Sequence, residues 1–319
     1  MKTAKWWLSA ALLIGGAADP LPAALFLGIE SDLRASLSDL DGGEASLYSF
    51  GGSGRWVFSD PQGDRLTLFV RGEWAEDLED DRLHEAYGEW KGPMGRWNIA
   101  AGRVALPWGL RTEWSPDRMP YRSPYEETRA PDSDTGLRLR GTVGAWDYGV
   151  ALTQGYGMET PDSFPGPGNL TGRIGWTPGL DGDFTMGLSA SEGTVPIAAH
   201  GHEDAMDSDD EDRTALALDA TLHFGRGTYR LEGGARHPGD RWRGTLFGAA
   251  DYAIGSRLTV QAAGQAYESE DSQRHRWGYI GLALPVKWMT LRGGYEYEKM
   301  DEEDHRVVVQ LYSVWRWVR

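Results

Sequence analysis

Arginine has the clearest chemical role in this sequence, because it recurs at positions that would line one wall of a cavity. In TGLRLRGTVGA (135–145), Arg138 and Arg140 alternate with Leu137 and Leu139. A period of two puts these residues on opposite faces of a β-strand. Because arginine stays charged at any working pH, a rail of arginines in a lumen would favour anions. Applying the same alternation to the other expected strands predicts which charged side chains face the lumen. They are Arg71, Glu73, Arg138, Arg140, Arg173, Asp219, His223, Arg230, Glu232, Arg236, Arg243, Asp251, Arg292, Glu296 and Glu298.

A second group of charges lies in the long segment from Pro107 to Asp134, PWGLRTEWSPDRMPYRSPYEETRAPDSD. Loops of this length inside a compact domain are usually functional, and we expect this one to fold into a pore and narrow it. Two interpretations of its charges stay open: they bias ion passage, or they pair and hold the loop against the wall. The charges are Arg111, Arg118, Arg122, Arg129, Glu113, Asp117, Glu126, Glu127, Asp132 and Asp134.

The segment HGHEDAMDSDDEDR (200–213) contains residues that could bind a metal. His200, His202, Glu203 and Asp204 could ligate a transition metal, and the carboxylates could bind Ca²⁺ through oxygen. The segment has no DxDxDG spacing, however, and runs of like charge are usually solvated. We therefore expect an acidic external loop, with no resident metal and no cofactor.

Catalytic signatures are missing from the sequence. It contains no GxSxG, no zinc-binding signature and no phosphate-binding loop. His275 lies near Ser272 and Asp271, but neighbours in one loop are weak evidence for a catalytic constellation. We expect no enzymatic activity. The formal net charge of −16 also argues against nucleic-acid binding, which needs a basic surface.

The elements that would position these residues are β-strands. From residue 25 onward the chain repeats about ten residues of alternating character and then a turn, which is the pattern of a transmembrane β-barrel. About sixteen strands are predicted, and fourteen is the alternative, because Gly51, Gly52 and Gly54 interrupt one of them. The expected strands are 26–37, 44–58, 65–75, 82–91, 96–106, 135–145, 146–156, 169–177, 183–191, 214–224, 227–236, 241–253, 257–268, 274–284, 288–298 and 305–315.

The predicted connections alternate between short and long. The short ones are 59–64, 92–95, 145–146, 178–183, 225–227, 254–256 and 285–287, and the long ones include 107–134, 157–168 and 194–213. Short periplasmic turns and longer external loops are typical of outer-membrane barrels. Aromatic residues gather near the predicted strand ends, as in the interfacial girdles of such barrels: Trp56, Trp74, Trp90, Trp97, Trp146, Trp176, Trp242, Tyr252, Tyr267, Trp288, Tyr297, Trp315 and Trp317.

The N-terminus has the pattern of a secretory signal peptide. Lys2 and Lys5 precede an apolar run from Trp6 to Ala18, and small residues follow. Residues 1–24 are the expected signal peptide, with cleavage after residue 18, 23 or 24; the alternative is a buried N-terminal helix. Residues 25–319 then form a single barrel domain. No later stretch reaches 18 apolar residues, and the chain has 43 Gly, 15 Trp and no Cys, as suits a polar barrel without disulfides.

The run LHEAYGEWKGPMGRWNIAAGRVALPWGLRTEW (83–114) resembles the segment of Gram-negative outer-membrane porins that leads into their inward-folded constriction loop. The resemblance implies a channel in the bacterial outer membrane that is surrounded by lipid and passes small hydrophilic solutes or ions by diffusion. A weak anion preference is expected, and monomer and homotrimer both stay open. The alternative is a non-conducting scaffold or receptor barrel, for example a sheath for a periplasmic or surface partner protein, with the long loop as a plug.

Overall fold

The computed structural model describes residues 23–319 except 41, 76–81, 113–118, 120–131, 158–165, 167, 180–181, 197–209, 239–240, 269–272 and 301. The described chain is almost entirely β-strand. Its strands are β1 (Ala23–Ser38), β2 (Gly42–Asp60), β3 (Gly63–Ala75), β4 (Arg82–Lys91), β5 (Asn98–Ala105), β6 (Ser133–Val143), β7 (Trp146–Thr153), β8 (Asn169–Trp176), β9 (Phe184–Pro196), β10 (Asp210–Phe224), β11 (Gly227–Pro238), β12 (Arg243–Ile254), β13 (Leu258–Glu268), β14 (Arg274–Val286), β15 (Met289–Lys299) and β16 (Glu303–Val318).

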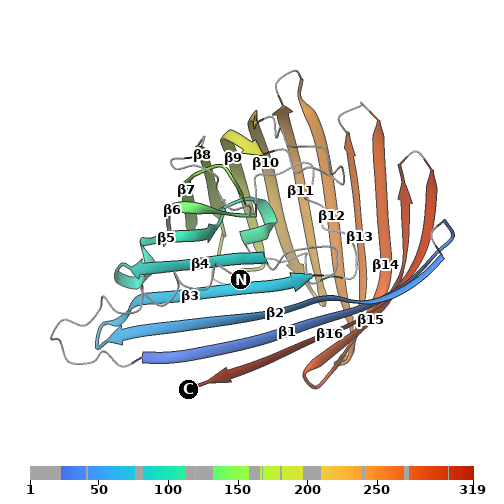
Figure 1. Cartoon of the computed structure of the whole chain (residues 1–319), viewed down its shortest axis with the longest axis horizontal. Coiled ribbons are helices and arrows are strands. Elements are labelled where there is room, and N and C mark those ends of the chain that lie inside the picture. Colours follow the sequence, from blue (N-terminus) through green and yellow to red (C-terminus); the bar gives the residue numbers. More distant parts are fainter. Residues whose placement is uncertain are drawn as a thin grey trace, which may run out of the picture.

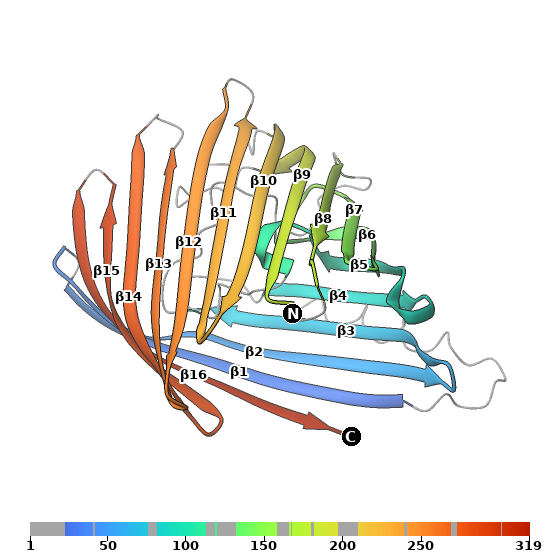
Figure 2. The ribbon, with the colours of Figure 1, turned by 180° about the vertical axis from the view of Figure 1, so that it is seen from behind.

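The strands close into one antiparallel barrel (Figures 1 and 2). Each strand pairs with its neighbours in the chain, and β1 completes the ring against β16, from Phe26 opposite Val318 to Ser38 opposite Arg306. Closure leaves no exposed sheet edge, so every strand has hydrogen-bonding partners on both sides. The predicted fold class, an antiparallel barrel of sixteen strands, is confirmed.

Several strands are longer than the sequence pattern predicted. β2 runs without a break through Gly51, Gly52 and Gly54, since backbone pairing with both β1 and β3 offsets the missing side-chain contacts. β9 and β10 extend to Pro196 and from Asp210, which shortens the expected loop 194–213. Hydrophobic alternation marks only the apolar part of a strand, whereas the hydrogen-bond ladder continues beyond it.

The polarity of the barrel is inverted relative to a soluble protein. On β10, Leu216 and Leu218 are 46% and 58% exposed, whereas the intervening Ala217 is 3% exposed. On β6, Leu137 and Leu139 are likewise exposed and Arg138 is buried. Apolar side chains therefore cover the outside and polar side chains face the lumen. Among the described residues, the only helical segments are η2 (Pro93–Gly95) and η3 (Gly109–Thr112), and neither is long enough to cross a membrane.

The two ends of the barrel differ. We define the short-turn rim as the end with connections 61–62, 92–97, 144–145, 177–183, 225–226, 255–257 and 287–288. The long-loop rim carries 39–41, 76–81, 106–132, 154–168, 197–209, 239–242, 269–273 and 300–302. Both ends of the described chain lie at the short-turn rim, where the backbones of Leu25 and Arg319 exchange two hydrogen bonds of 2.9 Å.

Glycine at position 102 is required for β5 to lie against β4. Its φ is +125°, and a Cβ there would lie 2.3 Å from the Ala86 carbonyl oxygen. We expect Gly102→Ala to lower the free energy of unfolding by about 1–3 kcal/mol, measured by urea unfolding of the refolded protein. Gly88→Ala on β4 is the matched control, because its Cβ would meet Leu68 at an ordinary 3.5 Å. Equal effects of the two substitutions would contradict this explanation.

Candidate functional site

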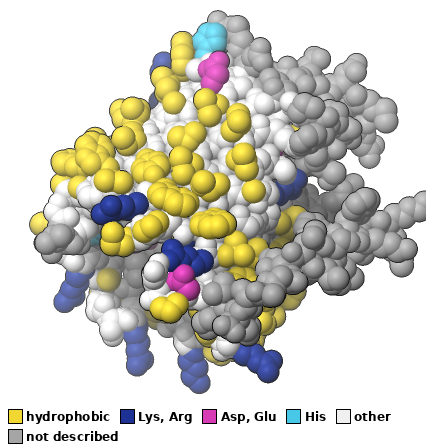
Figure 3. All heavy atoms as spheres, turned by 90° about the vertical axis from the view of Figure 1, so that its left-hand side faces the viewer, with side chains coloured by type: hydrophobic (Ala, Val, Ile, Leu, Met, Phe, Trp, Pro, Cys, Tyr) yellow, Lys and Arg dark blue, Asp and Glu magenta, His cyan; other side chains and the backbone are white. Residues whose placement is uncertain are grey.

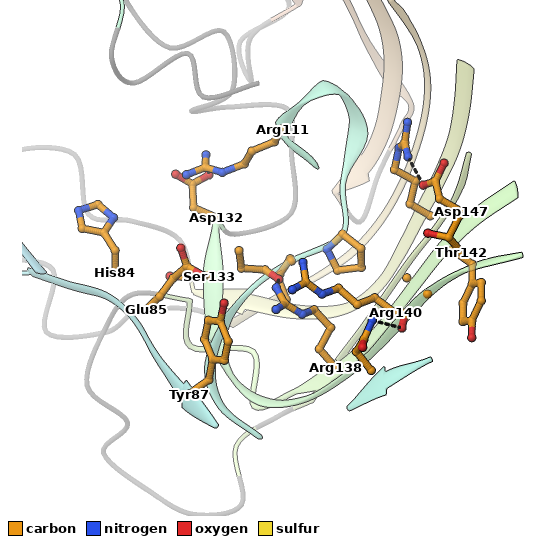
Figure 4. A pocket seen from close by; sticks show the side chains of 18 of the residues that line it. His84, Glu85, Tyr87, Arg111, Asp132, Ser133, Arg138, Arg140, Thr142 and Asp147 are labelled. Atoms are coloured by element: carbon orange, nitrogen blue, oxygen red, sulfur yellow. Dashed lines mark hydrogen bonds and ion pairs between the residues drawn. The ribbon is translucent and has the colours of Figure 1, made fainter. Parts of the chain in front are cut away.

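A cavity of about 500 Å³ lies inside the barrel along β4–β8, beneath the segment that follows β5 (Figure 4). Five arginines line it: Arg71, Arg111, Arg138, Arg140 and Arg173. Arg111 comes from η3 and the other four from β3, β6 and β8, where alternation along the strand turns their side chains away from the apolar outer surface. Carboxylates and polar groups also line the cavity, among them Glu85, Asp132 and Asp147.

Glu89 joins two of these arginines. Its buried carboxylate accepts two hydrogen bonds from Arg140, from Nε to Oε2 at 2.8 Å and from Nη2 to Oε1 at 2.9 Å. Arg138 Nη2 lies 3.5 Å from Oε2, and Arg138 Nη1 donates to the Ala105 carbonyl at 2.9 Å. The Glu89 side chain is 2% exposed and that of Arg140 is 48% exposed. The pair therefore hides its negative group and presents its positive group to the lumen.

Arg173 is held between two carboxylates. Its Nε and Nη2 donate to Asp219 at 3.1 and 2.7 Å, and its Nη1 donates to Asp147 at 2.8 Å. Glycines make room for this triad: a Cβ at Gly187 would lie 2.4 Å from Arg173 Nη2, and one at Gly175 would lie 2.1 Å from Asp147 Oδ2. Here the arginine and Asp219 are almost fully buried, and Asp147 is the exposed group.

A third cluster of charged side chains lies near β1. Arg71 Nη2 is 3.0 Å from Glu30 Oε1 and 3.4 Å from Glu73 Oε2, and His84 Nε2 is 3.4 Å from the same Glu73 oxygen. The other oxygen of Glu30 accepts a 2.8 Å hydrogen bond from the Tyr312 hydroxyl. Polar and charged side chains of β1, β3, β4 and β16 are thus linked across the seam where β1 pairs with β16.

The start of the long segment is fixed to the wall by backbone hydrogen bonds. Gly109 N donates to Ser189 Oγ at 3.0 Å, and Leu110 N donates to Glu232 Oε2 at 2.9 Å. Gly109 has a φ of +46°, and a Cβ there would lie 2.2 Å from the same Glu232 oxygen. Arg111 and Asp132 form an ion pair that joins the two described ends of the segment.

The described residues of the segment also make apolar contacts inside the barrel. Leu110 is fully buried against Phe247 of β12 and against Trp277 and Tyr279 of β14. Met119 packs on the same cluster, accepts a hydrogen bond from Arg34 Nη2 at its carbonyl (2.9 Å) and lies 3.8 Å from Gln261 Nε2 through its sulfur. β5 and β13 are eight strands apart in a ring of sixteen, so the contacts with β12, β13 and β14 lie on the wall opposite the strand that the segment leaves, whereas Arg34 belongs to β1.

The remaining predicted site residues divide into two groups. Arg230 pairs with Asp251 at 2.6 Å, Arg292 donates to Gln310 at 2.7 Å, and Arg243 is buried on an inward position of β12. Eleven of the other candidates lie outside the described residues: Arg118, Arg122, Arg129, Glu113, Asp117, Glu126, Glu127, His200, His202, Glu203 and Asp204. In the described part of the chain, no group of three or more His, Asp or Glu side chains is arranged to hold a metal ion.

His275, considered above beside Ser272 and Asp271, stacks on Tyr267 with ring centroids 4.9 Å apart. Ser272 and Asp271 lie outside the described residues.

Several lumen residues were not predicted from the sequence. Glu89 and Asp147 are carboxylates that hold Arg138, Arg140 and Arg173, and they were not among the predicted site residues. Their position was readable, because they share the inward phase of their strands with Tyr87 and Gly149. On β1 the same phase places Glu30, Asp32 and Arg34 inside, and Arg34 binds Asp32 Oδ2 at 2.8 Å.

Comparison with known proteins shows likeness of structure only. No family model matches the sequence, and no curated protein sequence matches it. The fold is similar to the anion-selective porin from Comamonas acidovorans, with a TM-score of 0.66 at 13% identity over 92% of this chain and 100% of the other. Salmonella typhi OmpF in complex with daunomycin gives a TM-score of 0.66 at 13% identity over 91% and 97%. The trimer form of OmpT, an outer membrane protein of Vibrio cholerae, gives 0.67 at 11% over 93% and 100%.

Proposed function

We propose that this protein is a porin of the Gram-negative outer membrane, through which small hydrophilic solutes or ions diffuse passively. The observation that carries the proposal is the closed barrel of sixteen strands with apolar side chains outside and charged side chains inside. Such an outer surface would be stable in lipid, and barrels of 16–18 strands leave an aqueous channel. The solved structures of similar fold are described as porins or outer membrane proteins, which supports the same location.

The segment between β5 and β6 sets the bore in this proposal. Its residue Leu110 packs on β12 and β14, on the far side of the barrel from β5, and this contact supports the proposal. The pore-facing charges Arg71, Arg111, Arg138, Arg140 and Arg173 surround the space that stays open beside it. The protein acts as a sieve without chemistry of its own, and no catalytic step is part of the proposal.

In this proposal the channel passes anions slightly more readily than cations. Arg140 is exposed while its partner Glu89 is hidden, which gives that part of the wall a positive surface. Asp147 is exposed while Arg173 is hidden, which opposes it. Arg71 and Arg230 are also paired with carboxylates, so we expect the residual field to be small. The anion selectivity named for the Comamonas acidovorans porin agrees with this sign.

The deciding experiment is single-channel recording of the refolded mature protein in a planar bilayer under a KCl gradient. A porin gives discrete open steps, and a reversal potential toward chloride supports the anion preference. Removing residues 107–131 and joining Leu106 to Asp132 through glycines should raise the conductance of an existing channel. A correctly folded barrel that is silent until the segment is removed would instead be the plugged scaffold or receptor.

Replacing Glu89 by glutamine should strengthen the anion preference. The substitution removes the charge that neutralises Arg140 and Arg138 and keeps an oxygen to accept their hydrogen bonds. One unit charge at about 4 Å is worth roughly 1 kcal/mol in a water-like medium, so we expect about a two- to fivefold rise in the chloride-to-potassium permeability ratio. The ratio is measured from the reversal potential.

Glu303→Gln at the long-loop rim is the matched control, since its exposed pair with Lys299 lies outside the lumen and its loss should leave the ratio unchanged. A shift toward potassium in Glu89→Gln would contradict the assignment.

The oligomeric state is a separate part of the proposal. One solved structure of similar fold is described as a trimer form, and we extend a homotrimer to this chain by that analogy. Light scattering of the protein in detergent, corrected for bound detergent, distinguishes one copy from three.

A further inference from the structure

Four turns on the short-turn rim each carry an exposed cation. They are Arg96 before β5, Arg226 between β10 and β11, Arg257 between β12 and β13, and Lys287 between β14 and β15. Within the described part of the chain, none of these four side chains forms an ion pair.

Two other cations of this rim, Arg65 and Lys91, are neutralised by partners. Arg65 Nε lies 2.6 Å from Asp60, and Lys91 Nζ lies 3.1 Å from Asp64. Among the described turn residues of this rim, Asp183 is the one exposed carboxylate that could offset the unpaired cations. The described part of the rim is therefore positive, although the chain as a whole carries −16.

Exposed aromatic side chains lie at or near the same rim, and all of them except Phe224 have a polar group on the ring. Trp97 and Trp288 adjoin Arg96 and Lys287 in the chain, and Trp288 also lies 4.8 Å from Trp315 between ring centroids. Aromatic rings with one apolar and one polar end settle at the headgroup level of a bilayer. Lys and Arg side chains that lie slightly beyond these rings, farther from the hydrocarbon core, would then reach the depth of the lipid phosphates. The exposed fractions of the aromatic residues are 39% for Trp97, 73% for Phe224, 47% for Tyr252 and 48% for Trp288.

Lys287 occupies a backbone conformation that glycine would adopt more easily. It is the first residue of a two-residue turn and has a φ of +55°. Gly is preferred at such a position, because an L side chain is strained there. The turn therefore bears a conformational cost at the residue that carries the positive charge to the rim.

We propose that Arg96, Arg226, Arg257 and Lys287 form a basic ring that binds the phosphate groups of anionic phospholipids in the leaflet on the short-turn side. The ring is spread over turns on both sides of the barrel, which fits an annulus of lipids better than one compact partner. In Figure 3, Lys and Arg side chains project along the lower edge of the molecule, below the hydrophobic surface of the wall. The ring rests on the membrane location in the proposed function, and it does not depend on conduction.

The test uses tryptophan quenching by brominated lipid. The protein is refolded into phosphatidylcholine vesicles that contain brominated phosphatidylglycerol or brominated phosphatidylcholine, and the relative affinity of the two lipids is read from the loss of fluorescence. We expect the wild type to favour the anionic lipid by about two- to fivefold at low salt and to lose this preference at high salt. Changing all four ring residues to glutamine should bring the ratio close to one.

The matched control removes the same number of cations from ion pairs. Arg65→Gln, Lys91→Gln, Arg241→Gln and Lys299→Gln together change the net charge equally, but each of these cations has a carboxylate partner. This variant should keep the preference. If the ring variant keeps it, or the control loses it equally, the proposal is wrong.

A single substitution keeps the test decisive even where the fourfold variant fails to refold. Lys287→Gly relieves the strained φ, so we expect a higher urea midpoint together with a smaller preference for the anionic lipid. A higher midpoint with an unchanged preference would overturn the proposal. A second outcome would also overturn the proposal: the wild type shows no lipid preference but sediments with isolated peptidoglycan, and the ring variant does not. The four cations would then bind peptidoglycan and not lipid. Conductance should stay at the wild-type value in every ring variant, so a silent barrel would count against the channel and not against the ring.

Discussion

Leu110→Ala should release the long segment from the barrel wall and produce a noisier channel with a larger mean conductance. The leucine is fully buried among Phe247, Trp277 and Tyr279, and it is the apolar contact that fixes η3 to β12 and β14. Removing a buried leucine side chain costs about 2–5 kcal/mol, which would shift the docking equilibrium of the segment by more than an order of magnitude. Open-channel current noise and mean conductance in single-channel recordings measure the effect.

Two substitutions control for this result. Leu110→Met conserves volume and should cost less than about 1.5 kcal/mol, so its recordings should resemble the wild type. Leu216→Ala removes an apolar side chain of the outer surface, 46% exposed, and should leave the conductance unchanged. An unaltered current in Leu110→Ala would show that the hydrogen bonds of Gly109 and Leu110 to Ser189 and Glu232 hold the segment without the apolar contact.

Asp219→Ala should give the largest loss of stability among single substitutions in the lumen. It removes the acceptor of two of the three hydrogen bonds that the buried Arg173 guanidinium donates to Asp147 and Asp219. Breaking a buried ion pair by removing one partner costs about 3–5 kcal/mol, since the remaining charge loses its compensation. The free energy of unfolding, measured by reversible urea unfolding in detergent micelles, should fall by about 3 kcal/mol.

The comparison variant breaks an exposed pair of similar geometry. Glu303→Ala removes the partner of Lys299, and both side chains of that pair are about half exposed. Exposed ion pairs contribute about 0–1 kcal/mol, so the unfolding curve should barely move. If Asp219→Ala lowered the free energy of unfolding no more than Glu303→Ala, the prediction would be wrong. Water in the lumen would then screen the charge of Arg173 as completely as solvent screens Lys299 at the rim.

Both predictions concern contacts that the sequence did not reveal, whereas the architecture that holds them was readable from it. The alternation of Leu137 and Leu139 with Arg138 and Arg140 determined which face of β6 turns outward, because the period of two is a local property of the strand. Repeating that pattern along the chain, with connections that alternate in length, was enough to predict the sixteen strands and their antiparallel order. Even the glycine-rich stretch that argued for fourteen strands proved to be one strand once closure gave it partners on both sides.

The contacts that give the lumen its shape were decided by the tertiary structure. Arg173 and Asp219 are 46 residues apart, and Leu110 N and Glu232 are 122 residues apart. No local pattern encodes which charges will meet, because the stagger of the strands and the closure of β1 on β16 set the distances between distant side chains. The sequence by itself therefore determined the wall and the charges available to face the lumen. Only the closed barrel decided which of those charges neutralise one another, which stay exposed, and where the long segment docks.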